Sequence, residues 1–354
     1  MDTWTHGLLG AAAAAALAGK GETRKALLVG ALAGALADMD IFFRSPADPV
    51  GSLLQHRYFT HALLFIPAGA LAAAVLSRLL VRGIPFRRAY VFSLVAYSTH
   101  ALLDCFTSYG TPWFLPFSKV RVAWDYISII DPAFSAPLFF AACAAYFKAW
   151  RGAARAGIAW CVLYLALGGV LHSAAERTLA EAARSRGETV LRMRALPSLG
   201  NLLVWRGIVD AGDHYRIDAV RLSVFGNRLY PGASVKPFRP DRDMPLLDRS
   251  SVLYRDMARF SYFADGWLYR DPRSPGEIGD LRYAAVPNST SPLWSIRPGP
   301  PGVHAEMVHH HRVRGAQLAS FWGMLKGLPE PAPAPVPAPG RGLAPPGGGA
   351  FHLK

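Results

Sequence analysis

The sequence predicts a polytopic α-helical membrane bundle of five to six spans, followed by a small, mainly-β extracytoplasmic domain. Of the 354 residues, 52% are hydrophobic and only 18% are charged, a balance more typical of membrane proteins than of soluble enzymes. Long runs of Ala, Leu, Val and Phe fill residues 7 to about 175, whereas charges recur every few positions from about residue 185. The N-terminal half is therefore expected to lie in the membrane and the remainder outside it.

The membrane-embedded part is expected to be helical, because an open sheet cannot satisfy its backbone hydrogen bonds in lipid. Most of the apolar runs approach the roughly 20 residues that a helix needs to cross a bilayer. The first run is short and rich in Ala and Gly, so a partial span is the alternative for it. The six candidate spans are residues 7–19, 26–43, 60–80, 88–106, 127–147 and 156–175.

The positive charges of the connecting loops predict the orientation. Basic residues concentrate in the first, third and fifth loops, which share one side of the membrane if all six segments cross it. These residues are Lys20, Arg24, Lys25, Arg78, Arg82, Arg87, Arg88, Lys148, Arg151 and Arg155. The positive-inside rule places these loops in the cytoplasm. The N-terminus and everything after residue 175 are then expected to face outward, away from the cytoplasm.

Acidic residues and histidines gather at the opposite, outer end. The acids of the first 175 residues are Asp2, Glu22, Asp38, Asp40, Asp48, Asp104, Asp125 and Asp131, and all but Glu22 lie at or near the outer face. The histidines His6, His56, His61, His100 and His172 also lie near outer ends. Solubility alone does not predict this one-sided distribution, which is expected of a metal site at the outer surface.

Four short motifs supply these residues: DTWTH at 2–6, ADMD at 37–40, HRYFTH at 56–61 and THALLD at 99–104. Positions four apart share one face of a helix, so His100 and Asp104 can point at one centre. Imidazoles and carboxylates together suit zinc or manganese, and the absence of thiolates argues against a structural cysteine site.

Each motif alone also has an ordinary structural explanation. The HxxxD pair is compatible with a hydrogen-bonded packing pair, ADMD with solvated acids at the end of a span, and HRYFTH with an interfacial loop whose side chains reach the headgroups. Independent accidents would scatter over both faces, so their joint placement favours one shared site. Asp131, before Pro132, is expected to cap a helix, and His172 is interpreted as a packing histidine.

Together the motifs resemble the bacterial inner-membrane metal-dependent hydrolases of the YdjM type. The matching elements are MDTWTHGLLG, ADMDIFF, HRYFTHALL, THALLDCFTSYGTPWFLPFS and WDYISIIDP, which cover roughly residues 1–135. The resemblance implies a polytopic membrane enzyme with a metal site of His and Asp. Carried onto this sequence, the implied ligands are His6, Asp38, His56, His61, His100 and Asp104. Asp2, Asp40 and Asp125 are further ligands, bases or orienting groups on the same interpretation.

The expected activity is metal-dependent hydrolysis, with zinc as the first choice of metal and manganese as the alternative. Asp40 or Asp104 would accept a proton from water. Arg57 would hold an anionic oxygen, or else its side chain reaches lipid headgroups. A site at headgroup level favours an amphiphilic or anionic substrate from the membrane, with a lipid phosphoester as the leading hypothesis.

Two other functions remain open at this point. A cation or proton transporter would use the same polar cluster, but it would be expected to carry charges at mid-span and on both sides. A non-catalytic membrane scaffold would bind a partner through the outer domain and keep the metal as a structural ion. The motifs favour the enzyme, and they leave the oligomeric state open.

The chain is expected to divide into a helical domain at 1–178, an outer domain at 185–327 and a disordered Pro/Gly-rich tail at 328–354. Runs such as TVLRMRAL, HYRIDAVRLSVF and LRYAAV predict strands, the segments PGAS and DPRSPGE predict turns, and ASFWGMLKG predicts a short helix. From residue 176 onward, 24 Lys and Arg face 16 Asp and Glu, an excess that attracts anionic headgroups. The sequence contains no motif for nucleic acid, which is not expected as a partner.

Overall fold

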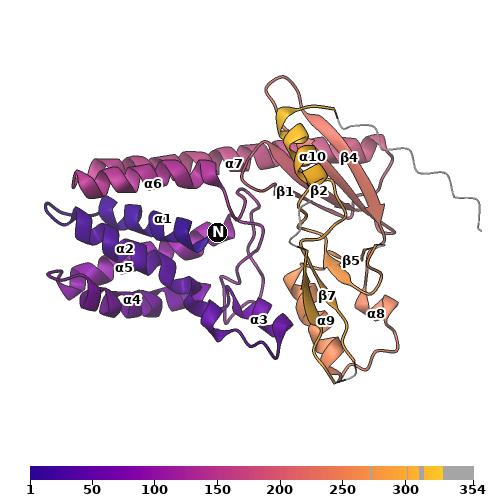
Figure 1. Ribbon diagram of the computed structural model, residues 1–354, viewed down its shortest axis with the longest axis horizontal. Coiled ribbons are helices and arrows are strands. Elements are labelled where there is room, and N and C mark those ends of the chain that lie inside the picture. Colours follow the sequence, from indigo (N-terminus) through magenta and orange to yellow (C-terminus); the bar gives the residue numbers. More distant parts are fainter. Residues whose placement is uncertain (272, 301, 311–314, 330–354) are drawn as a thin grey trace, which may run out of the picture.

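The computed structural model describes residues 1–271, 273–300, 302–310 and 315–329. Its N-terminal half is a bundle of helices, and its C-terminal part contains two four-stranded antiparallel sheets (Figure 1). The predicted order of a helical region followed by a mainly-β domain is confirmed. The Pro/Gly-rich tail lies outside the described residues from position 330.

Helices occupy all six predicted segments. They are α1 (Thr3–Ala16), α2 (Thr23–Leu36), α4 (Ile66–Leu80), α5 (Phe86–Cys105), α6 (Pro132–Phe147) and α7 (Arg151–Ser185). Within the described parts of the chain, three helical stretches are long and apolar enough to cross a membrane: Thr23–Phe43, Leu63–Leu80 and Arg151–Ser185. The stretch at Thr23–Phe43 joins α2 to the 3-10 helix η1 (Ala37–Phe43). Helices α1 and α6 are shorter, and α5 carries charged residues at both ends.

Proline explains where two helices begin later than the sequence predicted. The predicted third span begins with two short 3-10 turns, η2 (Phe59–His61) and η3 (Leu63–Phe65), before α4, which has Pro in its first turn. The predicted fifth span begins only at Pro132, and Asp131 caps it by accepting hydrogen bonds from the backbone N–H groups of Ala133 and Phe134. Proline is well suited to the first helical turn, and the residue before it avoids helical backbone angles.

Small residues allow α1 and α2 to pack in close contact. A Cβ at Gly30 would lie 2.3 Å from the carbonyl oxygen of Gly10, and a Cβ at Gly34 would lie 2.4 Å from the carbonyl oxygen of His6. Such close backbone approach is how helices associate where no hydrophobic effect drives them together. The packing places His6 of α1 beside α5, which carries His100.

The basic loops meet at one end of the bundle. Lys25 donates to the carbonyl of Gly83 at 2.7 Å, and Arg151 donates to the carbonyl of Ala18 at 3.1 Å. These contacts tie the first loop to the third and fifth. The N-terminus lies at the opposite end, which faces the sheets (Figure 1). The basic loops and the N-terminus therefore lie at opposite ends of the folded bundle.

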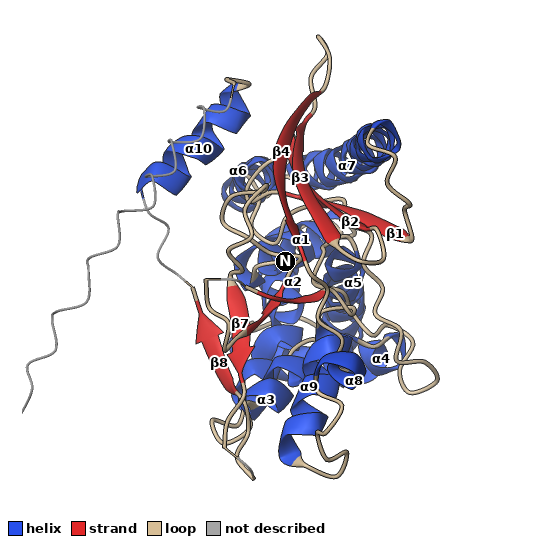
Figure 2. Cartoon of the chain, turned by 90° about the vertical axis from the view of Figure 1, so that its right-hand side faces the viewer, coloured by secondary structure: helices blue, strands red, loops and turns tan. Residues whose placement is uncertain are grey.

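The first sheet has the order β1 (Arg192–Pro197), β2 (Val204–Asp210), β3 (Tyr215–Arg221) and β4 (Arg228–Val235), and the second has the order β5 (Leu268–Arg270), β6 (Ile278–Asp280), β7 (Trp294–Arg297) and β8 (Glu306–His309). Four further helices are α3 (Pro49–Gln55), α8 (Pro240–Asp243), α9 (Val252–Phe263) and α10 (Gly315–Lys326). Helices α3 and α9 lie on the same side as the second sheet (Figure 2). Leu179 of α7 packs on Gly207 of β2, so the first sheet shares its core with the helical region.

The predicted strands TVLRMRAL and HYRIDAVRLSVF are confirmed as β1 and β3, and ASFWGMLKG is confirmed as part of α10. The prediction of a strand at LRYAAV was wrong, because the Asp280 side chain accepts a hydrogen bond from the backbone N–H of Arg282 and turns the chain after β6. The prediction of a turn at PGAS was also wrong. These residues lie within β4, where Gly232 permits close approach to the carbonyl of Ile217.

We expect Gly30→Ala to destabilise the protein by about 1–3 kcal/mol, because the new methyl group forces α1 and α2 apart. Thermal unfolding of the full chain in detergent measures this effect. Gly323→Ala in α10 is the control, since a Cβ added there would meet no atom of the described residues within 4 Å. Equal stability of the two variants would contradict the close packing of α1 on α2.

Candidate metal centre

Four side chains bring ligand atoms to one buried point at the end of the bundle that faces the sheets. They are Asp38 of η1, His61 of η2, and His100 and Asp104 of α5, and each side chain is at most 5% exposed. The Nε2 atoms of His61 and His100 lie 2.9 Å apart. Each also lies 3.5–3.6 Å from Asp38 Oδ1 and 3.4–3.6 Å from Asp104 Oδ2.

The four distances between imidazole nitrogens and carboxylate oxygens match the edges of a tetrahedral ligand shell, whereas the 2.9 Å between the two nitrogens is shorter than such an edge. Metal–ligand bonds of about 2.0–2.2 Å place tetrahedral ligand atoms roughly 3.3–3.6 Å apart. Two neutral imidazole nitrogens at 2.9 Å need a proton or a cation between their lone pairs. The donor set of two imidazoles and two carboxylates suits zinc or manganese. The residues present therefore fit a divalent metal.

Hydrogen bonds to the Nδ1 atoms hold both imidazoles in the orientation that a metal ligand requires. His100 Nδ1 lies 2.5 Å from the carbonyl oxygen of Gly34, which can only accept, so Nδ1 carries the proton and Nε2 is free. His61 Nδ1 lies 2.9 Å from the hydroxyl of Thr60, which in turn donates to Asp40 Oδ2 at 3.2 Å. Both rings therefore present Nε2 to the same point.

Each carboxylate likewise has one engaged oxygen and one that faces the histidines. Asp38 Oδ2 accepts from the hydroxyl of Thr3 at 2.6 Å. Asp104 Oδ1 lies 2.9 Å from His6 Nε2 and 3.0 Å from the Arg57 guanidinium. Asp104 Oδ2 has no hydrogen-bond partner among the described residues. A buried, unpaired carboxylate oxygen costs free energy, and a bound cation would remove that cost.

His6 lies beside this centre rather than within the four-atom cluster. Its ring stacks on that of His100, with centroids 3.6 Å apart, and its Nδ1 has no hydrogen-bond partner among the described residues. His6, His100 and Asp104 also bring ligand atoms within 4.8 Å of one another. His6 is therefore placed either to support Asp104 or to ligate a neighbouring second ion.

Asp40 and His56 hold the loop that carries His61. Asp40 Oδ1 lies 2.9 Å from His56 Nδ1, and Asp40 Oδ2 accepts from the backbone N–H of Arg57 at 2.8 Å. The backbone of Arg57 has a φ of +59°, an unusual angle for a non-glycine residue that this contact supports. The structure thus places Asp40 and His56 with each other, outside the groups that surround the centre.

Arg57 points inward and is only 2% exposed. Besides its contact with Asp104, it donates to the hydroxyl of Thr107 at 2.9 Å and lies over the ring of Tyr109, 4.7 Å from the centroid. The prediction that the Arg57 side chain extends to lipid headgroups therefore does not hold for this structure, because the side chain is buried in the protein. Its role in holding an anionic oxygen stays a prediction.

The two remaining predicted residues lie elsewhere. Asp2 caps α1 by accepting from the backbone N–H of Thr5 at 2.9 Å. Asp125 forms an ion pair with Arg194 of β1 at 2.6 Å. Sequence reasoning missed the supporting groups Thr3, Gly34, Thr60 and Thr107. Thr3 and Thr60 lie inside recognised motifs and Thr107 lies three residues after one, but nothing in the sequence marks the carbonyl of Gly34.

We expect Asp40→Asn to weaken metal affinity by about 10- to 100-fold, because residues that orient metal ligands have effects of that size. Asp40 contacts three groups of the loop without facing the centre itself. Zinc titration of the detergent-purified protein against a competing chelator measures the affinity. Asp125→Asn, which removes a buried carboxylate away from the centre, should leave affinity unchanged, and equal effects of the two variants would contradict the assignment.

The helical region is similar in sequence to known proteins. The chain is 29% identical over 179 residues to the uncharacterized protein YfhP of Bacillus subtilis (strain 168), a match that covers 48% of this chain and 52% of that protein. The chain thus spans about half the length of this curated relative. No solved structure matches. Residues 1–175, which include every residue of the candidate centre, match the family model of the YdjM inner membrane protein, as the motifs predicted.

Proposed function

We propose that this chain is a membrane-embedded, metal-dependent hydrolase whose divalent ion is held by Asp38, His61, His100 and Asp104. The observation that carries this proposal is the convergence of two free Nε2 atoms and two free carboxylate oxygens at ligand spacing. Zinc is the first choice and manganese the second. Both accept nitrogen and oxygen donors, and both expand beyond four ligands, which leaves room for water.

A metal in this centre would supply the Lewis acidity that makes water a nucleophile near neutral pH. The chain's own residues then position the reacting groups. Arg57 and His6 hold Asp104 through Oδ1, and Thr60 and Gly34 fix the two imidazoles. Asp40 has both oxygens engaged by the loop, so its role is to orient that loop.

A nearby cavity supports a catalytic rather than a purely structural ion. It has a volume of about 520 Å³ and is lined by His56, Tyr109 and Arg44 from the helical region and by Trp294 and Met307 from the second sheet. His56, which lines the cavity, has its ring centroid 6.2 Å from that of His61 of the centre. The largely apolar walls and Arg44 suit an amphiphile with an anionic group, such as a lipid phosphoester.

The proposed location is the bacterial inner membrane, with six helical passes. The N-terminus and the C-terminal domain would lie outside the cytoplasm. The gathering of the basic loops at the end of the bundle remote from the sheets supports this orientation. An enzyme is favoured over a transporter because the buried residues of α5 between the basic end and His100 carry no charge; they are Ala89, Phe92, Ser93, Ala96 and Tyr97.

We expect the purified protein to hydrolyse a phosphodiester such as bis(p-nitrophenyl) phosphate or a short-chain phosphatidylglycerol. A chelator should abolish this activity and zinc or manganese should restore it. His61→Ala or His100→Ala should lower the rate by more than about 100-fold, because even residues that only orient metal ligands contribute 10- to 100-fold. His214→Ala in the outer domain is the control. Activity that survives both the chelator and His100→Ala would contradict the proposal.

The orientation is tested by cysteine labelling in a variant without Cys105, Cys143 and Cys161, all of which lie in apolar helices. On intact spheroplasts, a membrane-impermeant maleimide should label Asp213→Cys in the outer domain. It should label Arg82→Cys only after the membrane is permeabilised. The reverse pattern would show that the basic loops face outward.

A further inference from the structure

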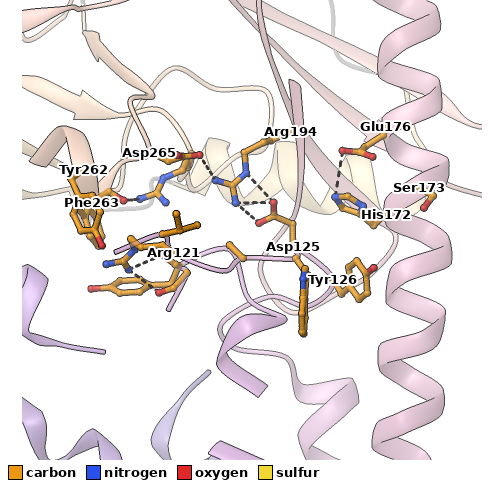
Figure 3. A pocket seen from close by; sticks show the side chains of 16 residues that line it. Arg121, Asp125, Tyr126, His172, Ser173, Glu176, Arg194, Tyr262, Phe263 and Asp265 are labelled. Atoms are coloured by element: carbon orange, nitrogen blue, oxygen red, sulfur yellow. Dashed lines mark hydrogen bonds and ion pairs between the residues drawn. The ribbon is translucent and has the colours of Figure 1, made fainter. Parts of the chain in front are cut away.

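A second cavity, of about 670 Å³, lies where the helical region meets the outer domain. Its walls come from the loop between α5 and α6, from the outer part of α7, from β1 and from the end of α9 (Figure 3). In this view Arg121 lies near Tyr262 and Phe263 on one side, His172 and Glu176 of α7 lie on the other, and the Asp125–Arg194 pair lies between them.

Arg121 lines this cavity without a carboxylate partner among the described residues. Its Nη2 donates to the carbonyl oxygens of Tyr109 and Gly110, at 2.9 and 2.8 Å. Its Nε is buried and has no hydrogen-bond partner in the described parts of the chain, and no Asp or Glu in those parts forms an ion pair with it. Burial accordingly lowers the pKa of the Arg121 guanidinium.

The other two arginines of the cavity differ from Arg121 in this respect. Arg194 forms an ion pair with Asp125 at 2.6 Å, and Arg282 forms one with Asp280 at 2.7 Å. Both therefore have their charge compensated by a carboxylate, whereas no described residue compensates the charge of Arg121 in this way. A buried charge is costly unless an opposite charge pairs with it, so an anion from outside would stabilise this side chain.

Aromatic rings hold the Arg121 guanidinium in place. It lies 5.2 Å from the ring centroid of Tyr109, 5.4 Å from that of Phe263 and 5.9 Å from that of Tyr262. Cation–π contacts stabilise the charged group without neutralising it. The guanidinium is thus preorganised, with its positive charge still available to a ligand.

We infer that this cavity binds a phosphate oxyanion, through Arg121. The planar guanidinium matches phosphate geometry and stays charged when partly buried. The cavity is larger than an inorganic ion requires, and Val120, Trp124 and Tyr126 add apolar surface. The headgroup of a phospholipid therefore fits it as well as free phosphate does. The inference does not rest on the proposed hydrolysis, because none of the residues of this cavity is a proposed metal ligand.

Isothermal titration of the full chain in detergent tests the site with two probes, inorganic phosphate and short-chain phosphatidylglycerol, and with diacylglycerol as the phosphate-free control. We expect saturable binding of at least one phosphate probe. Arg121→Gln should weaken it by about 10- to 100-fold, the effect of losing a charged hydrogen-bond donor. Arg228→Gln changes an exposed arginine of β4 and should leave binding unchanged.

Binding of phosphatidylglycerol alone would identify a lipid headgroup as the ligand, and equal binding of both probes would identify the free oxyanion as sufficient. If Arg121→Gln does not fold, Ala123→Phe fills the cavity and retains the arginine, and it should reduce binding similarly. No binding by the wild type, or binding that neither variant weakens, would overturn the inference.

Discussion

The helical region depends on how the protein accommodates one fully buried carboxylate, that of Asp104. In a medium of low dielectric constant this group requires positive charge and hydrogen-bond donors. Arg57 supplies them to Oδ1 from the HRYFTH loop, and the ammonium of Met1 and the ring of His6 supply them from the N-terminal segment that contains α1. Satisfying Oδ1 draws these two segments against α5 and leaves Oδ2 directed at His61 and His100. The geometry of the candidate metal centre thus follows from the packing that stabilises Asp104.

Contacts at both ends of the helical bundle stabilise the packing around Asp104. Glycines on α1 and α2 allow the backbone approach that places His6 beside His100, while the basic loops meet at the far end of the bundle. The second sheet contributes Trp294 and Met307 to the cavity next to His56. The C-terminal domain therefore forms part of the surroundings of the candidate centre.

Much of this could be predicted from the sequence because helical spacing and loop charge are local signals. The separation of His100 and Asp104 by four residues placed both on one face, and the one-sided acids and histidines predicted that the motifs meet. The different roles of His56 and His61 within HRYFTH could not be predicted. It depends on the positive φ of Arg57 and on Asp40, which holds His56 and leaves His61 free to face the centre. LRYAAV and PGAS were misjudged because a side-chain turn at Asp280 and a close strand contact at Gly232 outweigh local propensity.

The most direct test of the metal centre is the metal content of the detergent-purified full chain, measured by elemental mass spectrometry. We predict stoichiometric zinc or manganese in the wild type and its loss in His61→Ala and in Asp38→Asn. His214→Ala should retain the metal, and circular dichroism should show that all variants remain helical. A wild-type protein that binds no metal even after reconstitution with zinc or manganese would contradict the assignment of a metal centre.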